Sequence, residues 1–142
     1  DHVRVAPELR RRTGAPILLH PADRPLWELT HGGDAPEGEG AELWDVDLTD
    51  GQTLTVGGAA VTVLHTPGHA PGAVCLYVHD LGCVFTGDTL FEGGPGATGR
   101  SYSDSDLIRD SIRRRLLDLP DETVVHTGHG PDTTIGAERE NL

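Results

Sequence analysis

The sequence predicts an α+β fold in which short β-strands are covered by helices. Hydrophobic residues make up 36% of the 142 residues and aromatic residues only 4%, so we expect a core built mainly from Val, Leu, Ile and Ala. Short apolar runs recur along the whole chain, which argues against disorder. The 19 Gly and 10 Pro predict frequent turns. A chain of this length is expected to form one domain, residues 1–142.

The first third of the chain is predicted to hold two helices and one strand. Residues 5–12 are expected to be helical and to end at Thr13-Gly14. A short buried strand is predicted at residues 16–20, and a second helix at residues 21–30, which begins with proline. Residues 31–41 are rich in Gly and acidic residues. They are predicted to form an exposed loop, with a lid over a substrate as the alternative.

Two β-hairpins are predicted in the middle of the chain. Residues 52–56 and 60–65 flank Gly57-Gly58, and residues 73–78 and 83–86 flank residues 79–82.

The last third is predicted to contain a long helix, a short strand and the start of another helix. Apolar residues in 104–119 have the spacing of an amphipathic helix. Ser103 or Asp104 can cap its start, and Pro120 ends it. A final strand is expected at residues 123–126 and a helix from residue 134.

The charge of the chain narrows its expected partners. The formal net charge is -12 at pH 7, so neither nucleic acid nor an anionic membrane surface is expected to bind. No apolar run approaches the roughly 20 residues of a membrane helix, and no signal peptide is visible.

Cys75 and Cys83 lie in strand-like runs and are expected to be buried free thiols, with a disulfide as the alternative. A cytoplasmic protein with a small-molecule substrate is predicted, and the oligomeric state is left open.

Three predicted strands end in the same way. Each is followed by a glycine and then by a residue that can bind metal: His69, Asp88 or His129. Glycine permits the sharp turn that directs the next side chain across the sheet edge. Imidazole nitrogen and carboxylate oxygen are ligands suited to Zn²⁺ or iron. If the three strands are neighbours in one sheet, these side chains converge on a metal site.

The motifs in these three segments resemble those of the metallo-β-lactamase superfamily. Its signature HxHxDH is followed by a helix and then by His, Asp and His on later loops. Asp1-His2 matches the last two letters of the signature. The segments HTPGHAPG (65–72), FTGDTLF (85–91) and HTGHGP (126–131) match the later motifs in order, with greatest similarity to the glyoxalase II-like branch.

The resemblance implies an αββα sandwich whose N-terminal part is missing. The two histidines of HxH would precede residue 1, and the sequence contains no Met, so we expect a truncated single domain. Among the residues present, Asp1, His2 and His129 would bind the second metal. His69 would bind the first metal, and Asp88 would bridge the two.

The resemblance also implies the chemistry. Two Zn²⁺ ions, with iron or a mixed pair as alternatives, would share a bridging water and convert it to hydroxide at neutral pH. The hydroxide would attack a carbonyl, that of a small-thiol thioester or of a lactone, and Asp1 would accept a hydrogen bond from it. The segment GGPGATGRSYSD departs from the pattern of glutathione-specific members, so another thiol such as mycothiol is an alternative carrier.

Several further residues have two interpretations each. Arg100 and Tyr102 are candidates for anchoring a substrate, with a surface Arg and a half-buried Tyr as the alternative. His65 and His126 are either supports that orient the ligands or core residues at strand ends. His20 is expected to be a structural residue between a strand and a helix, whereas His31 and His79 are expected to be solvated residues in loops.

Two rivals to the hydrolase remain. A persulfide dioxygenase of the same fold would use one iron, held by histidines and the bridging Asp88. Alternatively, the chain as given is an inactive metal-binding remnant, because without the HxH pair little hydrolysis is expected from residues 1–142 alone.

Overall fold

The computed structural model describes residues 1–32 and 43–142. Within these residues the chain divides into two compact units, Asp1–Leu48 and Thr49–Leu142. The proposed lid falls almost wholly on residues 33–42 and lies outside the described part. A single domain over residues 1–142 stays a prediction.

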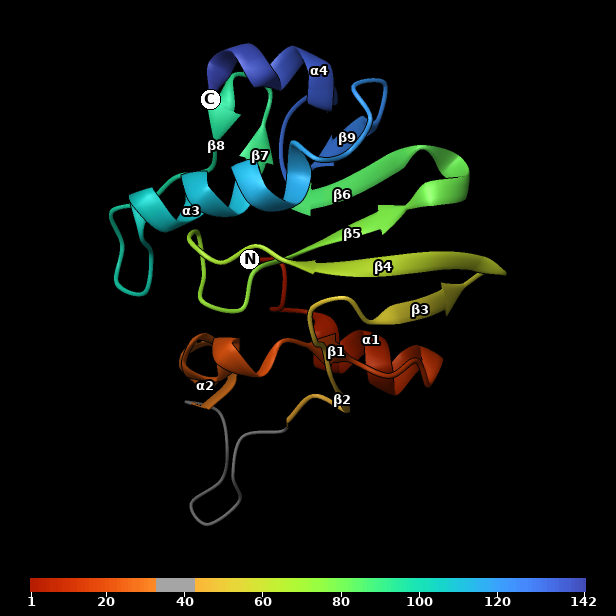
Figure 1. The fold of residues 1–142 in the computed structure, drawn as a ribbon. Helices are drawn as coiled ribbons and strands as arrows, with labels where there is room; N and C mark the ends of the chain where they lie inside the picture. The colour runs from red at the N-terminus through yellow and green to blue at the C-terminus, as the bar shows by residue number, and fades with distance from the viewer. Residues whose placement is uncertain (33–42) are drawn as a thin grey trace. The chain divides into compact units, whose positions relative to one another are not determined.

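The first unit contains the two predicted helices and a small parallel sheet (Figure 1). Helix α1 (Ala6–Thr13) ends at Gly14, whose φ of +73° is the left-handed conformation that glycine adopts readily. Strand β1 (Leu18–Leu19) pairs with β2 (Val46–Asp47), which the sequence did not predict. A 3₁₀ turn (Pro21–Asp23) leads into helix α2 (Arg24–His31).

The buried residues of this unit include two tryptophans, Trp27 and Trp44. Trp27 on α2 is 1% exposed and packs edge-to-face on Trp44, with ring centroids 5.9 Å apart. His31 was predicted to be solvated in a loop, and that prediction is wrong. His31 is the last residue of α2, its ring lies 4.2 Å from Trp27, and its Nε2 is 3.1 Å from the Val3 carbonyl oxygen.

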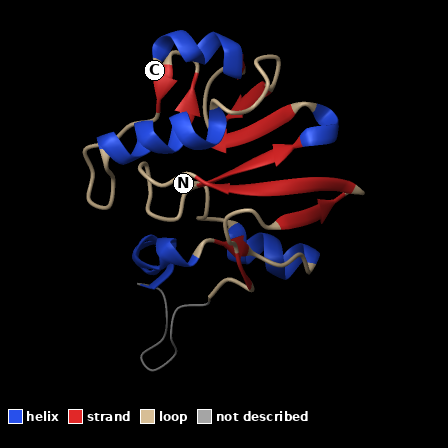
Figure 2. Cartoon of the chain, viewed as in Figure 1, coloured by secondary structure: helices blue, strands red, loops and turns tan. Residues whose placement is uncertain are grey.

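The second unit is built on a six-stranded sheet in the order β10-β9-β6-β5-β4-β3 (Figures 1 and 2). Both predicted hairpins are confirmed: β3 pairs with β4 across Gly57-Gly58, and β5 pairs with β6 across a 3₁₀ turn (His79–Leu81). The strands are β3 (Thr53–Val56), β4 (Ala59–His65), β5 (Val74–Val78), β6 (Cys83–Gly87), β9 (Val124–Thr127) and β10 (Thr133–Thr134).

Helices connect the two strands of this sheet that pair in parallel. Strands β6 and β9 are parallel neighbours, so the chain must cross over between them. The crossover contains a small hairpin, β7 (Leu90–Phe91) and β8 (Gly94–Pro95), followed by α3 (Ser105–Ser111) and a π-helical segment (Ile112–Leu116). Asp104 caps α3 by accepting hydrogen bonds from two backbone N–H groups, as predicted. After β10 come α4 (Ile135–Glu138) and a 3₁₀ turn (Arg139–Asn141).

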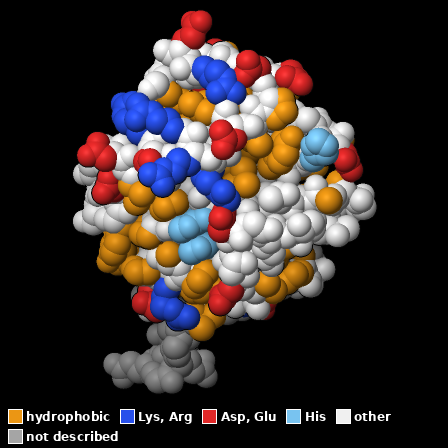
Figure 3. Space-filling model, viewed as in Figure 1, with side chains coloured by type: hydrophobic (Ala, Val, Ile, Leu, Met, Phe, Trp, Pro, Cys, Tyr) orange, Lys and Arg blue, Asp and Glu red, His pale blue; other side chains and the backbone are white. Residues whose placement is uncertain are grey.

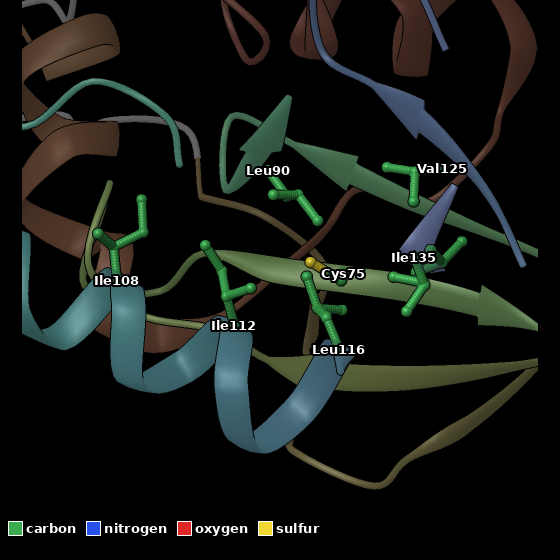
Figure 4. Close-up of a cluster of buried hydrophobic side chains, with 8 residues drawn as sticks. Cys75, Leu90, Ile108, Ile112, Leu116, Val125 and Ile135 are labelled. Atoms are coloured by element: carbon green, nitrogen blue, oxygen red, sulfur yellow. The ribbon is translucent and has the colours of Figure 1, made fainter. Parts of the chain in front are cut away.

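The crossover helix supplies one side of the core of the second unit. Its side chains point toward the sheet, where they meet residues of β5 and β9 (Figure 4). The eight residues of this cluster are all at most 1% exposed: Cys75, Val84, Leu90, Ile108, Ile112, Leu116, Val125 and Ile135.

The two cysteines are buried and unpaired, as predicted. Burial raises the pKa of the Cys75 thiol to about 11, although hydrogen bonds from Thr66 and Thr89 partly oppose the shift. Cys75 is therefore a neutral core residue at physiological pH. No helix among residues 1–32 and 43–142 is long and apolar enough to cross a membrane.

The three strands that carry the predicted metal ligands run in the same direction. Strands β4 and β6 are both antiparallel to β5, so they are parallel to each other, and β9 is parallel to β6 (Figure 1). Their carboxyl ends therefore meet at one edge of the sheet. The expectation that they are neighbours is right for β6 and β9, whereas β5 separates β4 from β6.

Gly68 is a position at this edge of the sheet that leaves no room for a side chain. Its φ is +140°, and an added Cβ would overlap the backbone of Ile108 in α3. The loop before His69 therefore lies directly against this helix.

We expect Gly68→Ala to lower the free energy of unfolding by at least about 1 kcal/mol more than Gly82→Ala. Gly82 also has a positive φ, +58°, but open space surrounds it. The loss of stability in Gly82→Ala therefore comes from backbone strain alone, about 1–2 kcal/mol, without a steric overlap. Urea unfolding of both variants makes the comparison, and equal losses would contradict it.

Candidate metal centre

Asp88 lies between two histidines at the sheet edge of the second unit. Its Oδ2 is 3.5 Å from Nε2 of His69, and its Oδ1 is 3.5 Å from Nε2 of His129. The carboxylate is 16% exposed, against 33% for the side chain of His69 and 55% for that of His129. Each oxygen of one carboxylate thus faces a different imidazole.

His69 is oriented by a backbone carbonyl. Its Nδ1 lies 2.8 Å from the carbonyl oxygen of Ala97, which can only accept, so Nδ1 carries the proton. In the neutral ring Nε2 then bears the lone pair, and Nε2 is the atom that faces Asp88. A hydrogen bond of this kind fixes both the tautomer and the orientation of a metal-binding histidine.

The loop that carries His69 is fastened to helix α3. The Asp104 N–H donates to the carbonyl of Gly68 at 2.7 Å, and the Ser111 hydroxyl donates to the carbonyl of Pro67, also at 2.7 Å. Together with the close approach of Gly68 to Ile108, these bonds hold the backbone just before His69.

Asp88 sits in a tight turn directly after β6. The Thr89 N–H donates to the carbonyl of Thr86 at 3.0 Å, which closes the turn, and the Gly96 N–H donates to the carbonyl of Thr89. Two glycines make room for the aspartate. A Cβ on Gly96 would overlap the carbonyl oxygen of Asp88, and a Cβ on Gly128 would overlap its Oδ1. The backbone therefore packs around Asp88 as closely as glycine allows.

His129 is held by the loop after β9. The Gly128 N–H donates to the carbonyl of Gly87 at 2.7 Å, which joins this loop to the strand that carries Asp88. The Thr127 hydroxyl donates to the carbonyl of His129 at 2.7 Å. The ring of Phe91 stacks on that of His129, with an interplanar angle of 19° and centroids 6.4 Å apart.

The donor separations fit metal ions. Two ligand atoms of one tetrahedral Zn²⁺, at bond lengths near 2.1 Å, lie about 3.3–3.5 Å apart. The Nε2–Oδ2 and Nε2–Oδ1 separations on either side of Asp88 are both 3.5 Å. Nitrogen and carboxylate oxygen also match the preference of Zn²⁺ and iron. The second unit therefore brings together three of the five predicted ligands: His69, Asp88 and His129.

The other two predicted ligands begin the first unit. Asp1 and His2 are both exposed, and Oδ1 of Asp1 lies 3.9 Å from Nε2 of His2. Their joining with Asp88 and His129 in one centre stays a prediction of the resemblance.

Arg100 and Tyr102 lie in one exposed turn. The Ser103 hydroxyl oxygen accepts from the N–H groups of Gly99 and Arg100, and it donates to the carbonyl of Arg100 at 2.7 Å. Tyr102 is 50% exposed and has a φ of +73°, which is unusual for a residue with a side chain. Their role in substrate binding stays a prediction.

Three other histidines make contacts away from the predicted ligands. The His65 Nε2 lies 2.9 Å from the carbonyl oxygen of Pro71, and the His20 Nδ1 accepts from the N–H of Ala22. His126 pairs with Asp132 at 2.9 Å, and its ring lies 5.0 Å from that of Phe85. None of these bonds orients the ring of a predicted ligand.

The sequence analysis missed the groups that surround Asp88. The Ala97 carbonyl carries no sequence signal, because any residue supplies one. Gly96 and Gly128 were visible as glycines near a ligand, but their contact with Asp88 follows only from the fold. The sequence also shows four threonines within three residues of predicted ligands: Thr66, Thr86, Thr89 and Thr127.

We predict that Gly128→Ala weakens metal binding at least tenfold, because the new methyl group displaces the Asp88 carboxylate. Gly128 has no positive φ, so the substitution introduces no backbone strain of that kind. Gly130→Ala is the control, since open space surrounds Gly130 and its φ of +80° adds backbone strain without any contact with Asp88. Competition with a chromophoric chelator measures both affinities. Unchanged affinity in Gly128→Ala, or an equal loss in Gly130→Ala, would show that contact with Asp88 is unimportant.

Comparison with known proteins places the chain in a family. The family model described as "Metallo-beta-lactamase superfamily" matches residues 1–129. The chain is 34% identical over 148 residues to "Hydroxyacylglutathione hydrolase GloC" of Haemophilus influenzae, covering 99% of this chain and 69% of that protein.

Two solved structures have closely similar folds. The B3 metallo-beta-lactamase BLEG-1 gives a TM-score of 0.84 at 34% identity, over 99% of this chain and 69% of that chain. TTHA1623 in a di-iron-bound form gives 0.83 at 38% identity, over 99% and 70%. The predicted α+β metallo-β-lactamase fold is therefore confirmed. The chain belongs to the metallo-beta-lactamase superfamily, whose members are metal-dependent hydrolases.

Proposed function

We propose that the protein is a two-metal hydrolase that cleaves the thioester of a small thiol. The observation that carries this proposal is the Asp88 carboxylate, which presents one oxygen to each of two histidines at 3.5 Å. A carboxylate with both oxygens so placed is suited to bridging two cations. A carboxylate that bound a single cation through one oxygen would not need its second oxygen to face another histidine.

Zn²⁺ is the proposed metal, with iron or a mixed pair as alternatives. His69 and Asp88 would hold the first ion, and His129 and Asp88, with Asp1 and His2, would hold the second. A pair of such ions lowers the pKa of a shared water and stabilises the negative charge that develops on an attacked carbonyl oxygen. The di-iron form of TTHA1623 supports the alternative that a site of this kind accepts iron.

The residues of the chain act by holding these groups in place. The Ala97 carbonyl keeps the Nε2 of His69 directed at Asp88. Gly128 lies against the Asp88 carboxylate, and Gly96 lies against the backbone carbonyl of Asp88. Asp1 would accept a hydrogen bond from the attacking water.

A thioester is proposed as substrate because of the similarity to GloC, whose name specifies a hydroxyacyl thioester of glutathione. Arg100 and Tyr102 are proposed to anchor the thiol carrier. The turn fixed by Ser103 and the positive φ of Tyr102 support this role, because strained, exposed residues concentrate at binding sites. The segment that contains them favours a small thiol other than glutathione, and a lactone is the alternative substrate.

The partners of the protein stay predictions of the sequence, as does its cytoplasmic location. On the face in Figure 3, Arg side chains lie among acidic ones. In the second unit Arg114 pairs with Asp110, and Arg139 pairs with Asp121. Charge neutralised in this way provides little attraction for a nucleic acid.

A difference between His69 and His129 favours the alternative function, a persulfide dioxygenase that uses one iron. His69 is fixed by Ala97 and is 33% exposed, whereas His129 is 55% exposed. A persulfide dioxygenase would use the better-fixed side alone. Metal content therefore separates the two functions.

Elemental analysis of the intact gene product, purified without added metal, tests the proposal. We expect two equivalents of zinc, or of zinc and iron, together with thioester hydrolysis. We expect Asp88→Ala to lose both metals and at least a hundredfold in activity. Asp80→Ala is the control, because Asp80 is an exposed aspartate in the turn between β5 and β6. An Asp88→Ala variant with full metal content would disprove the bridge, and a single iron would favour the dioxygenase.

A further inference from the structure

A cluster of polar side chains lies inside the apolar core of the second unit. Its members are at most 1% exposed and are Thr66, Cys75, Thr86 and Thr89, which we call the threonine cluster. The Thr66 hydroxyl oxygen is 3.2 Å from that of Thr89 and 3.3 Å from the sulfur of Cys75. The Cys75 thiol points at the carbonyl oxygen of Thr86, 3.8 Å away.

The threonines of this cluster flank the predicted metal ligands. Thr66 follows β4 and precedes His69 by three residues. Thr86 and Thr89 lie on either side of Gly87-Asp88. The hydrogen bond between Thr66 and Thr89 therefore joins the loop of His69 directly to the turn of Asp88.

The sheet itself provides no such connection. Strands β4 and β6 do not pair, because β5 lies between them. At the ligand edge the β4–β5 pairing stops at His65 opposite Val74, and β6 pairs with β5 only as far as Phe85 opposite Leu76. Beyond these residues, the Thr66–Thr89 bond is a direct side-chain link across the gap.

Breaking the hydrogen bond between Thr66 and Thr89 also has a cost in stability. A buried hydroxyl without a partner costs about 1–3 kcal/mol, so each hydroxyl needs the other or a neighbouring polar atom. A well-packed Val–Val pair would fill a similar volume without fixing a donor–acceptor distance. The hydroxyls thus supply a directional constraint within an otherwise apolar core.

We propose that Thr66 and Thr89 are positioning residues that set the separation of His69 from Asp88 and so determine metal affinity. The proposal rests on the assignment of His69 and Asp88 as ligands, but not on the substrate. Neither threonine contacts the metal or the substrate in this role. Both act through the backbone of the ligand loops.

The test compares Thr66→Val and Thr89→Val with the wild-type protein in the intact gene product. The Kd for Zn²⁺ is measured by chelator competition, and the Tm of the metal-free protein is measured separately. We expect each variant to raise the Kd of one Zn²⁺ by tenfold or more, in the range found when groups that orient metal ligands are removed. The double variant should raise it no more than about twofold beyond the single ones, because both hydroxyls form one link.

Matched controls separate positioning from general destabilisation. Thr123→Val removes a hydroxyl that is equally buried, at 1% exposure, but is not part of the threonine cluster. It should lower the Tm without changing the Kd. Thr66→Ser and Thr89→Ser retain the hydroxyl and should keep the Kd within about threefold of wild type, whereas Thr66→Ala and Thr89→Ala should not.

A Kd within twofold of wild type in both valine variants would overturn the proposal, as would a loss in Thr123→Val as large as theirs. If a valine variant does not fold, the Ser and Ala variants decide, and equal Kd values for the two would overturn it. Because Kd is measured on Zn²⁺ alone, absence of thioester hydrolysis in the wild-type protein would leave this result intact.

Discussion

The candidate site depends on the parallel direction of β4, β6 and β9. Two successive antiparallel pairings, through β5, give β4 the direction of β6, and the helical crossover gives β9 that direction as well. The loops that follow these three strands therefore begin at the same edge of the sheet. His69 and His129, which are far apart in sequence, are thereby each brought to 3.5 Å from an oxygen of the Asp88 carboxylate.

Glycines are as important for this edge of the sheet as the residues that carry the predicted ligands. Gly68 allows the loop of His69 to lie against the backbone of α3, and Gly96 and Gly128 allow the chain to close around Asp88. These contacts make the Asp88 carboxylate part of a close-packed framework rather than the tip of a free loop. A rigid framework reduces the cost of arranging ligands when a metal binds.

Much of this fold could be predicted from the sequence because its signals are local. The hairpin at Gly57-Gly58, the Asp104 cap and the end of α1 at Gly14 each depend on a few adjacent residues. The short strands β7, β8 and β10 were missed, because strands of two residues show no periodicity. His31 was misplaced because its contacts, with Trp27 and the carbonyl of Val3, come from packing and from a distant backbone atom.

The candidate site shows the same division. The predicted ligands and their order are visible as motifs in the sequence, whereas the contacts around them are not. The Ala97 carbonyl and the Thr66–Thr89 bond both join segments more than 20 residues apart, and no spacing rule connects them. What the sequence does show is a threonine within three residues of each of His69, Asp88 and His129, which becomes meaningful only once the strands are known to end together.

Diffraction at the absorption edge of the bound metal would test the bridging role of Asp88 most directly. Crystals of the metal-loaded intact gene product should show two anomalous peaks. One should lie at bonding distance from Nε2 of His69 and the other from Nε2 of His129, with one Asp88 oxygen bound to each. A single peak, or two peaks that do not share Asp88, would contradict a two-metal centre built around this carboxylate.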